Sequence, residues 1–195
     1  MISIYDLKSR FQNLLRPICQ NLADRGVTAN QVTISALILS VIYGAVLCLN
    51  VQILWLLLPI ILFIRMGLNA IDGMLAREHN MKSKLGMALN EAGDVISDTA
   101  LFIPFIFYVP NAIWAVGVFI IVAIMSEFCG LLAFMMCGER RYDGPMGKSD
   151  RALAIAVLGF LIGLGISLQP VLGWIFILLT ALCIWSCINR LRSAL

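Results

Sequence analysis

The sequence has a single histidine, few charged residues and no C-x-x-C pair among its six cysteines. Charged residues make up 13% of the 195 residues, whereas hydrophobic residues make up 61% and the mean hydropathy is +0.95. A soluble domain of this size cannot hide so much apolar surface from water, so a soluble globular chain is excluded. The composition therefore predicts an integral membrane protein.

The residues that are scarce also limit the chemistry. The cysteines lie almost entirely in apolar runs, which indicates small buried apolar side chains rather than disulfides or metal ligands. His79 lies in a polar connector, where a solvated side chain is expected rather than a ligand. The first residues, MISIYDLKSRFQ, have no apolar core beside a basic start, so no cleaved signal peptide is expected.

Residues 2 to about 25 are predicted to form an amphipathic helix that Gly26 ends. Lys8, Arg10 and Arg16 lie away from an apolar side formed by Ile4, Leu7, Phe11, Leu14, Leu15 and Ile18. Such a helix lies flat on an anionic membrane surface, where each basic residue contributes about 1 kcal/mol. A soluble helix that binds a partner is the alternative.

Six apolar segments follow, each close to the roughly 20 residues that a bilayer core of about 30 Å requires. They cover approximately 31–49, 52–78, 85–109, 112–137, 151–168 and 171–189. Thr28 or Asn30 is expected to cap the first segment, and Pro110 to close the third. No internal repeat or low-complexity linker is visible. The prediction is one all-α membrane domain over 1–195, with an interfacial amphipathic helix in 1–26 and a six-helix transmembrane bundle in 27–195.

The positions of the basic residues predict the orientation. All except Arg65 lie in the N-terminal helix, the connector 77–84, the loop 140–151 or the tail 190–192. Cytoplasmic segments are enriched in Lys and Arg, so all four basic segments and both termini are expected to face the cytoplasm.

Polar residues concentrate between Leu68 and Asp98. One helical stripe comprises Asn69, Asp72, Gly73, Ala76 and Arg77, and a second comprises Gly86, Asn90, Gly93, Asp94 and Ser97, with Asp98 at its margin. A carboxylate within a membrane costs a few kcal/mol or more, so it marks a candidate functional site. Oxygen ligands with small residues between them suit hard cations and a phosphate-bearing ligand. An interhelical hydrogen-bond cluster without a ligand is the alternative.

This stretch resembles the signature of the CDP-alcohol phosphotransferases, D-x-x-D-G-x-x-A-R, eight residues, then G-x-x-x-D-x-x-x-D. Asp72-Gly73, Ala76-Arg77, the eight-residue gap to Gly86, and Asp94 match it, whereas Asn69 and Asn90 replace the first and third aspartates. The resemblance implies transfer of a phosphatidyl group from CDP-diacylglycerol to a small alcohol, with release of CMP. It also implies a homodimer in a bacterial inner membrane, with the active site facing the cytoplasm.

The resemblance further implies residue roles by position. One or two Mg²⁺ or Mn²⁺ ions would be held by Asp72, Asp94, Asn69, Asn90 and Asp98, with Asp94 also the catalytic base. The CDP group would lie against Asn69, Gly73, Ala76, Arg77, Gly86 and Thr33; Thr33 belongs to an N-x-x-T pattern with Asn30, which helix capping explains equally well. Each asparagine removes a negative charge, so affinity for a second metal is expected to fall. A non-catalytic member that binds CDP-lipid or a partner without turnover is the alternative function.

Lys148 and Arg151 bracket a helix start in the loop GERRYDGPMGKSDR. The resemblance implies that this pair binds the phosphate of a phosphorylated alcohol, such as glycerol phosphate or inositol phosphate. The orientation rule explains basic residues here without a binding site.

A function as an ion or proton pathway is disfavoured, because no pattern of polar residues reaches the opposite face of the membrane.

Two further charges, Arg65 and Glu127, lie deep in apolar segments. A buried ion pair between them would satisfy both. The alternative is that Arg65 supplies positive charge in place of a missing metal ion. Arg65, Asn69 and Asn90 would then together alter the charge of the site.

Overall fold

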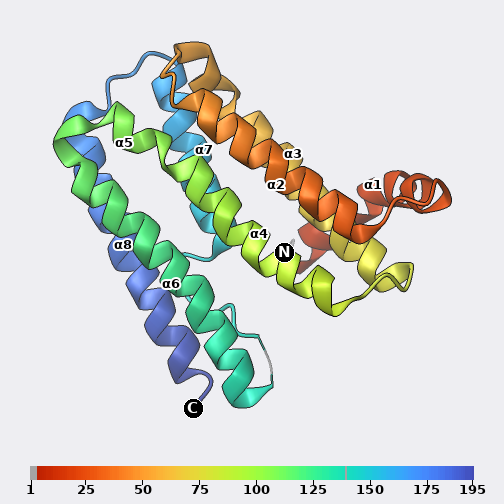
Figure 1. Cartoon of the computed structure of the whole chain (residues 1–195). Coiled ribbons are helices and arrows are strands. Elements are labelled where there is room, and N and C mark those ends of the chain that lie inside the picture. The colour runs from red at the N-terminus through yellow and green to blue at the C-terminus, as the bar shows by residue number, and fades with distance from the viewer. Residues whose placement is uncertain (1–3, 139) are drawn as a thin grey trace. The chain divides into compact units, whose positions relative to one another are not determined.

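The computed structural model describes residues 4–138 and 140–195, with side chains from residue 11 onward. Within these residues every regular element is a helix (Figure 1). The elements are α1 (Ile4–Asp24), α2 (Ala29–Leu47), α3 (Gln52–Glu78), α4 (Lys84–Phe102), α5 (Pro104–Tyr108), the 3₁₀ turn η1 (Pro110–Ala112), α6 (Ile113–Cys137), α7 (Lys148–Gly163) and α8 (Gln169–Arg192). By length and composition, four stretches are able to cross a membrane: α2, α3, Pro110–Cys137 and α8.

Most of the predicted helix boundaries are confirmed to within a few residues, but the third predicted segment is wrong in one respect. It is not continuous to Pro110, because α4 ends at Phe102 and α5 begins at Pro104. Proline has no N–H to donate and its ring clashes with the carbonyl four residues earlier, so the helix is interrupted there.

The chain folds into two compact units. The first extends to residue 42 and includes 60–97, so it contains α1, most of α2, the second half of α3 and most of α4. The second comprises 43–59 and 98–195, which includes α5 to α8.

In the first unit, α1 packs onto α2 and α3 through a core of buried side chains, namely Cys19, Ala29, Val32, Ile71, Met74 and Leu75. The predicted end of α1 is confirmed, since Gly26 has a positive φ of 76° that favours glycine. The Thr28 Oγ1 accepts from the Gln31 backbone N–H at 3.3 Å and the Gln31 Oε1 accepts from the Thr28 N–H at 2.9 Å. This reciprocal pair is a capping box, so Thr28 starts α2.

The apolar side of α1 divides between this core and the surface. Leu15 packs against the core, whereas Leu14 is 72% exposed and Ile18 is also exposed. Ile4 and Leu7 belong to the part of α1 whose side chains lie outside the described ones. Burial raises the pKa of the Cys19 thiol, and nearby Glu78 adds to the rise against the opposing effect of Arg16. The thiol therefore behaves as a small buried apolar group, as the sequence predicted.

The second unit is built around packed aromatic rings and a pair of long helices. Phe105 lies between Trp55, at 4.7 Å between ring centroids, and Phe176, at 5.5 Å. The helices α6 and α8 run side by side (Figure 1). At Gly163 of α7 a Cβ atom would lie 2.3 Å from the Leu56 backbone nitrogen, so only glycine permits α7 to approach α3 this closely.

Candidate active site

Asp72 is held in the first unit by a hydroxyl from a different helix. The Thr33 Oγ1 on α2 donates to the Asp72 Oδ2 on α3 at 2.8 Å, and both residues are buried. Thr33 Oγ1 also lies 3.1 Å from the Ala29 carbonyl, one turn earlier in α2. A buried carboxylate is costly without hydrogen bonds. This contact satisfies one Asp72 oxygen and orients the carboxyl group.

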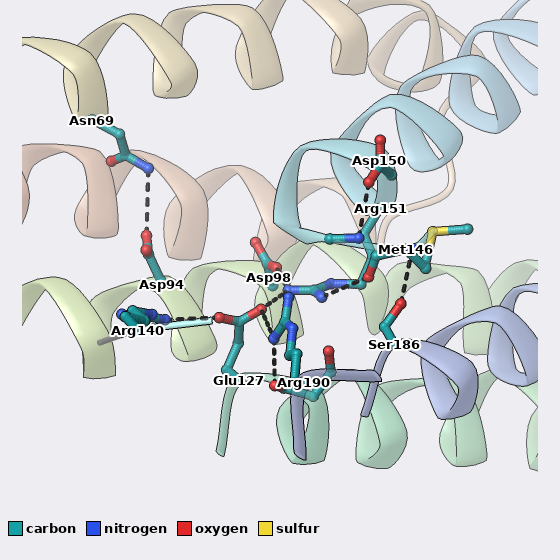
Figure 2. A network of polar contacts seen from close by, with 12 residues as sticks. Asn69, Asp94, Asp98, Glu127, Arg140, Met146, Asp150, Arg151, Ser186 and Arg190 are labelled. Atoms are coloured by element: carbon teal, nitrogen blue, oxygen red, sulfur yellow. Dashed lines mark hydrogen bonds and ion pairs between the residues drawn. The ribbon is translucent and has the colours of Figure 1, made fainter. Parts of the chain in front are cut away.

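Asp94 on α4 is joined to α3 by two side chains. The Asn69 Nδ2 donates to the Asp94 Oδ1 at 3.3 Å, and Figure 2 shows the two side chains pointing toward each other. The Arg65 Nη2 lies 3.6 Å from the same Oδ1 and donates to the Asp94 backbone carbonyl at 3.4 Å. We call Thr33, Arg65, Asn69, Asp72 and Asp94 the acidic cluster.

Three glycines bring other polar side chains close to the helix backbones of the first unit. A Cβ at Gly73 would lie 3.1 Å from Arg77 Nη1, so the exposed Arg77 guanidinium lies over this glycine. A Cβ at Gly86 would lie 2.7 Å from Asn30 Oδ1 and force that amide to move. Gly93 of α4 faces the methyl group of Thr33. The first turns of α2 thus meet the signature stretch, and the part played by Asn30 was not apparent from the sequence.

The other predicted residues of the stretch, Ala76, Asn90 and Asp98, lie outside the acidic cluster. Ala76 packs at the edge of the core of the first unit, and Asn90 is half-buried on α4. Asp98 belongs to the second unit, where its Oδ2 accepts from the Arg151 Nη2 at 3.2 Å.

The second unit contains a buried group of charged side chains centred on Glu127 of α6 (Figure 2). Arg151 Nη2 donates to Glu127 Oε1 at 2.7 Å, Arg140 Nη2 donates to Oε2 at 3.0 Å, and Arg190 Nη1 lies 3.6 Å from Oε1. Arg190 also donates to the Ser126 carbonyl. We call Asp98, Glu127, Arg140, Arg151 and Arg190 the arginine cluster.

The arginine cluster has more positive than negative groups, since three guanidinium groups face two carboxylates. Arg151 and Arg190 are 1% and 2% exposed. Their Nε atoms are buried with no hydrogen-bond partner within the described part of the chain. Unpaired buried donors are costly, so these two Nε atoms are an unfavourable feature of the cluster.

The helix start predicted at Ser149-Asp150 is present as the first turn of α7. The Asp150 Oδ2 accepts from the Gly147 backbone N–H at 2.9 Å, which caps the helix, and Lys148 is its first residue. Of the predicted basic pair, Arg151 joins the arginine cluster and Lys148 is half-buried.

Residues 26–185 match the family model described as CDP-alcohol phosphatidyltransferase. The chain belongs to this family. It is 47% identical, over its full length and 97% of the other protein, to the inner membrane protein YnbA of Escherichia coli strain K12.

Solved structures of the phosphatidylinositol phosphate synthase PgsA1 of Mycobacterium tuberculosis share the CDP-alcohol phosphatidyltransferase fold with this chain. The structure with CDP-DAG bound has a TM-score of 0.77 at 19% identity, covering 91% of this chain and 92% of that one. The structure with manganese and citrate has a TM-score of 0.76 at 19% identity, covering 91% and 87%. At this identity the likeness establishes the fold.

Arg65 and Glu127, for which a mutual ion pair was expected, each have charged partners within their own unit. Arg65 contacts Asp94, and Glu127 contacts three arginines. Arg140 and Arg190 were interpreted from the sequence only as signs of orientation. The one signal for their role was Glu127 itself, a lone acid in an apolar segment that needs positive partners.

The donors in the acidic cluster suit a hard divalent cation. Within the described residues, no group of three or more histidine, cysteine, aspartate or glutamate side chains is placed to hold a metal ion. The available donors are the carboxylates of Asp72 and Asp94 and the amide oxygen of Asn69, and Asn90 of α4 is a further candidate by its position in the signature. Oxygen donors of this kind favour Mg²⁺ or Mn²⁺ over metals that prefer nitrogen or sulfur. The donor types of this set fit a divalent ion of this kind.

Proposed function

We propose that this chain transfers a phosphatidyl group from CDP-diacylglycerol to a small alcohol and releases CMP, as a step of phospholipid synthesis. The observation that carries the proposal is the convergence of α2, α3 and α4 on the acidic cluster, with Thr33 bonded to Asp72 and Asn69 bonded to Asp94. Family membership and the CDP-DAG complex of PgsA1 support the same activity.

The proposed reaction is attack of an alcohol oxygen on the phosphorus that carries the diacylglycerol. A new phosphorus–oxygen bond forms, the bond to the bridging oxygen breaks, and CMP leaves with that electron pair. Asp94 accepts the hydroxyl proton as general base. Asp72, Asp94, Asn69 and Asn90 would hold a Mg²⁺ or Mn²⁺ ion, which would supply charge neutralisation at the diphosphate.

Other residues of the first unit would bind the CDP group. The exposed Arg77 is suited to charge-assisted hydrogen bonds with phosphate oxygens. Gly73 and Gly86 let Arg77 and Asn30 lie close to the α3 and α4 backbones, and the nucleotide would bind beside them, alongside Ala76, Asn69 and Thr33. Thr33 orients Asp72 through its 2.8 Å hydrogen bond.

We propose that the acceptor is itself phosphorylated, and that Lys148 and Arg151 bind its phosphate. The positive balance of the arginine cluster and the unpartnered Nε of Arg151 support an anionic acceptor. Because Arg151 is bonded to both Glu127 and Asp98, an incoming phosphate must compete with these carboxylates. We assign Asp98 primarily to this pairing, with its predicted contribution to metal binding secondary.

The membrane arrangement that we propose has six spans, a cytoplasmic active site and both termini in the cytoplasm. The helices α4 and α7 would supply the two spans beyond the four that qualify by length and composition. The exposed Leu14 and Ile18 support an interfacial position for α1. A homodimer is part of this proposal by family resemblance.

Measuring CMP release by the purified protein tests the function. The protein in lipid nanodiscs is given CDP-diacylglycerol, Mn²⁺ or Mg²⁺, and a panel of acceptors that pairs each phosphorylated polyol with its unphosphorylated form. We expect metal-dependent CMP release that requires an acceptor and is faster with the phosphorylated member. Saturable binding of CDP-diacylglycerol without CMP release for any acceptor would instead establish the alternative, a non-catalytic family member.

A further inference from the structure

Arg65 is aimed at the residue proposed as base and metal ligand. Its Nη2 lies 3.6 Å from the Asp94 Oδ1 and 3.4 Å from the Asp94 carbonyl oxygen. The Arg65 side chain is 4% exposed, compared with 18% for that of Asp94. Two contacts with one residue, made from a buried position, fix the guanidinium beside the Asp94 carboxylate.

The same carboxylate oxygen receives the Asn69 amide. Asn69 Nδ2 donates to Asp94 Oδ1 at 3.3 Å, at a position where the signature has its first aspartate. An aspartate there would place two carboxylates against each other and would need a cation between them. The asparagine instead donates a hydrogen bond to Asp94, so the Asp94 oxygen is satisfied by groups of the protein itself.

The charge of the acidic cluster follows from these substitutions. The signature has four carboxylates, whereas this chain keeps Asp72 and Asp94 and adds the positive charge of Arg65. Two divalent ions would face only one net negative charge from Asp72, Asp94 and Arg65 together, and the ion nearer Asp94 would also be repelled by the guanidinium. A single divalent ion and a diphosphate leave the site much closer to neutral.

We infer that Arg65 is a built-in cation that takes the charge role of one metal ion, so that the site holds a single divalent ion, bound mainly by Asp72. The inference deepens the proposed function, on which it rests for the presence of a divalent ion. In this arrangement Arg65 is a positioning residue: it holds Asp94 and neutralises charge through it.

Counting bound Mn²⁺ tests the inference without measuring turnover. The electron paramagnetic resonance signal of free Mn²⁺ is followed while the purified full chain in nanodiscs is titrated, with and without CDP-diacylglycerol. We expect one Mn²⁺ per chain for the wild type. The double variant Arg65→Gln with Asn69→Asp is expected to bind two, because it removes the competing cation and restores a carboxylate.

Further variants separate the charge role from a merely structural one. Asn69→Asp alone is expected to keep one Mn²⁺ per chain, since Arg65 still repels a second cation near Asp94, and Arg65→Lys with Asn69→Asp should also keep one. If Arg65 only joined α3 to α4, the Lys and Gln versions would give the same stoichiometry. Arg16→Gln with Asn69→Asp is the matched control, because Arg16 is an exposed arginine of the same unit paired with Glu78 at 3.1 Å. It should bind one Mn²⁺.

Two Mn²⁺ ions per wild-type chain would overturn the inference, and so would one ion in the Gln double variant. Circular dichroism and thermal unfolding of each variant establish that only folded protein is counted, and the wild-type count keeps the test decisive if the Gln version fails to fold. Metal-dependent CMP release together with two bound ions would leave the proposed function standing while the inference fails. Absence of any bound Mn²⁺ in the presence of CDP-diacylglycerol would overturn both.

Discussion

The two polar clusters of this protein use the same chemical groups, carboxylates and guanidiniums, in opposite proportions. The acidic cluster has two carboxylates and one guanidinium, and its Asp94 side chain retains 18% exposure. The arginine cluster has three guanidiniums and two carboxylates, and the Arg151 and Arg190 side chains are almost completely buried.

We propose on the basis of this difference that the two clusters bind ligands of opposite charge. Two carboxylates, one buried and one partly exposed, with one net negative charge suit a cation together with the diphosphate that it carries. Buried guanidiniums whose Nε atoms lack a partner among the described residues suit an anion. The carboxylates of Asp98 and Glu127 in the same cluster already stabilise much of their positive charge. We therefore expect substitutions in the acidic cluster to act mainly on catalysis and metal binding, and those in the arginine cluster mainly on stability and acceptor selection.

The largest effect is expected for Asp94→Asn. Loss of a general base reduces the rate by about 10²–10⁴-fold, and here one of the two carboxylate ligands is lost as well. The rate of CMP release measures this loss of activity. Asp24→Asn, an exposed α1 residue that accepts from Gln20, is the control and should retain wild-type activity. Retention of more than a tenth of the wild-type rate by Asp94→Asn would remove the base from the mechanism.

A large loss of stability is expected for Arg151→Met. The change leaves Asp98 and Glu127 without the guanidinium that lies within 3.2 Å of both, and breaking a buried pair costs about 3–5 kcal/mol. Thermal unfolding in detergent measures it. Arg16→Met breaks an exposed pair with Glu78 and should cost less than about 1 kcal/mol. Equal stability of the two variants would contradict the contrast between buried and exposed arginines.

A smaller, selective effect is expected for Glu127→Gln. Removing this negative charge frees Arg151 and Arg190 for a competing phosphate, so the KM for a phosphorylated acceptor should fall about tenfold, which corresponds to about 1.4 kcal/mol. CMP release against acceptor concentration measures it, with the unphosphorylated polyol as the comparison. An unchanged KM for the phosphorylated acceptor would mean that its phosphate does not bind beside Glu127.

The smallest effect is expected for Asn90→Asp. An added carboxylate on the half-buried face of α4 should raise Mn²⁺ affinity about three- to tenfold through its charge. The Mn²⁺ titration described above measures it. Asn13→Asp, the same change at an exposed residue of α1, should leave the affinity as in the wild type. Unchanged affinity in Asn90→Asp would show that Asn90 lies outside the coordination shell.

The prediction from sequence was most successful where the deciding interactions are local. The Thr28 cap and the end of α1 near Gly26 depend on residues within one turn of each other, and both are confirmed. The break before Pro104 is equally local, and it was missed because the apolar run continues through it. For the candidate site, the positions of the signature residues were evident, whereas Asn30 beside Gly86 and the arginines around Glu127 were not.

The sequence by itself determined that the protein is helical, rich in segments able to cross a membrane and equipped with a family signature, because hydropathy, periodicity and spacing act within short stretches of chain. Only the tertiary structure decided which buried charge pairs with which. Arg65 meets Asp94 from 29 residues away and Arg190 contacts the Ser126 carbonyl from 64 residues away. Electrostatic pairing depends on distance in space, and packing of the helices sets that distance.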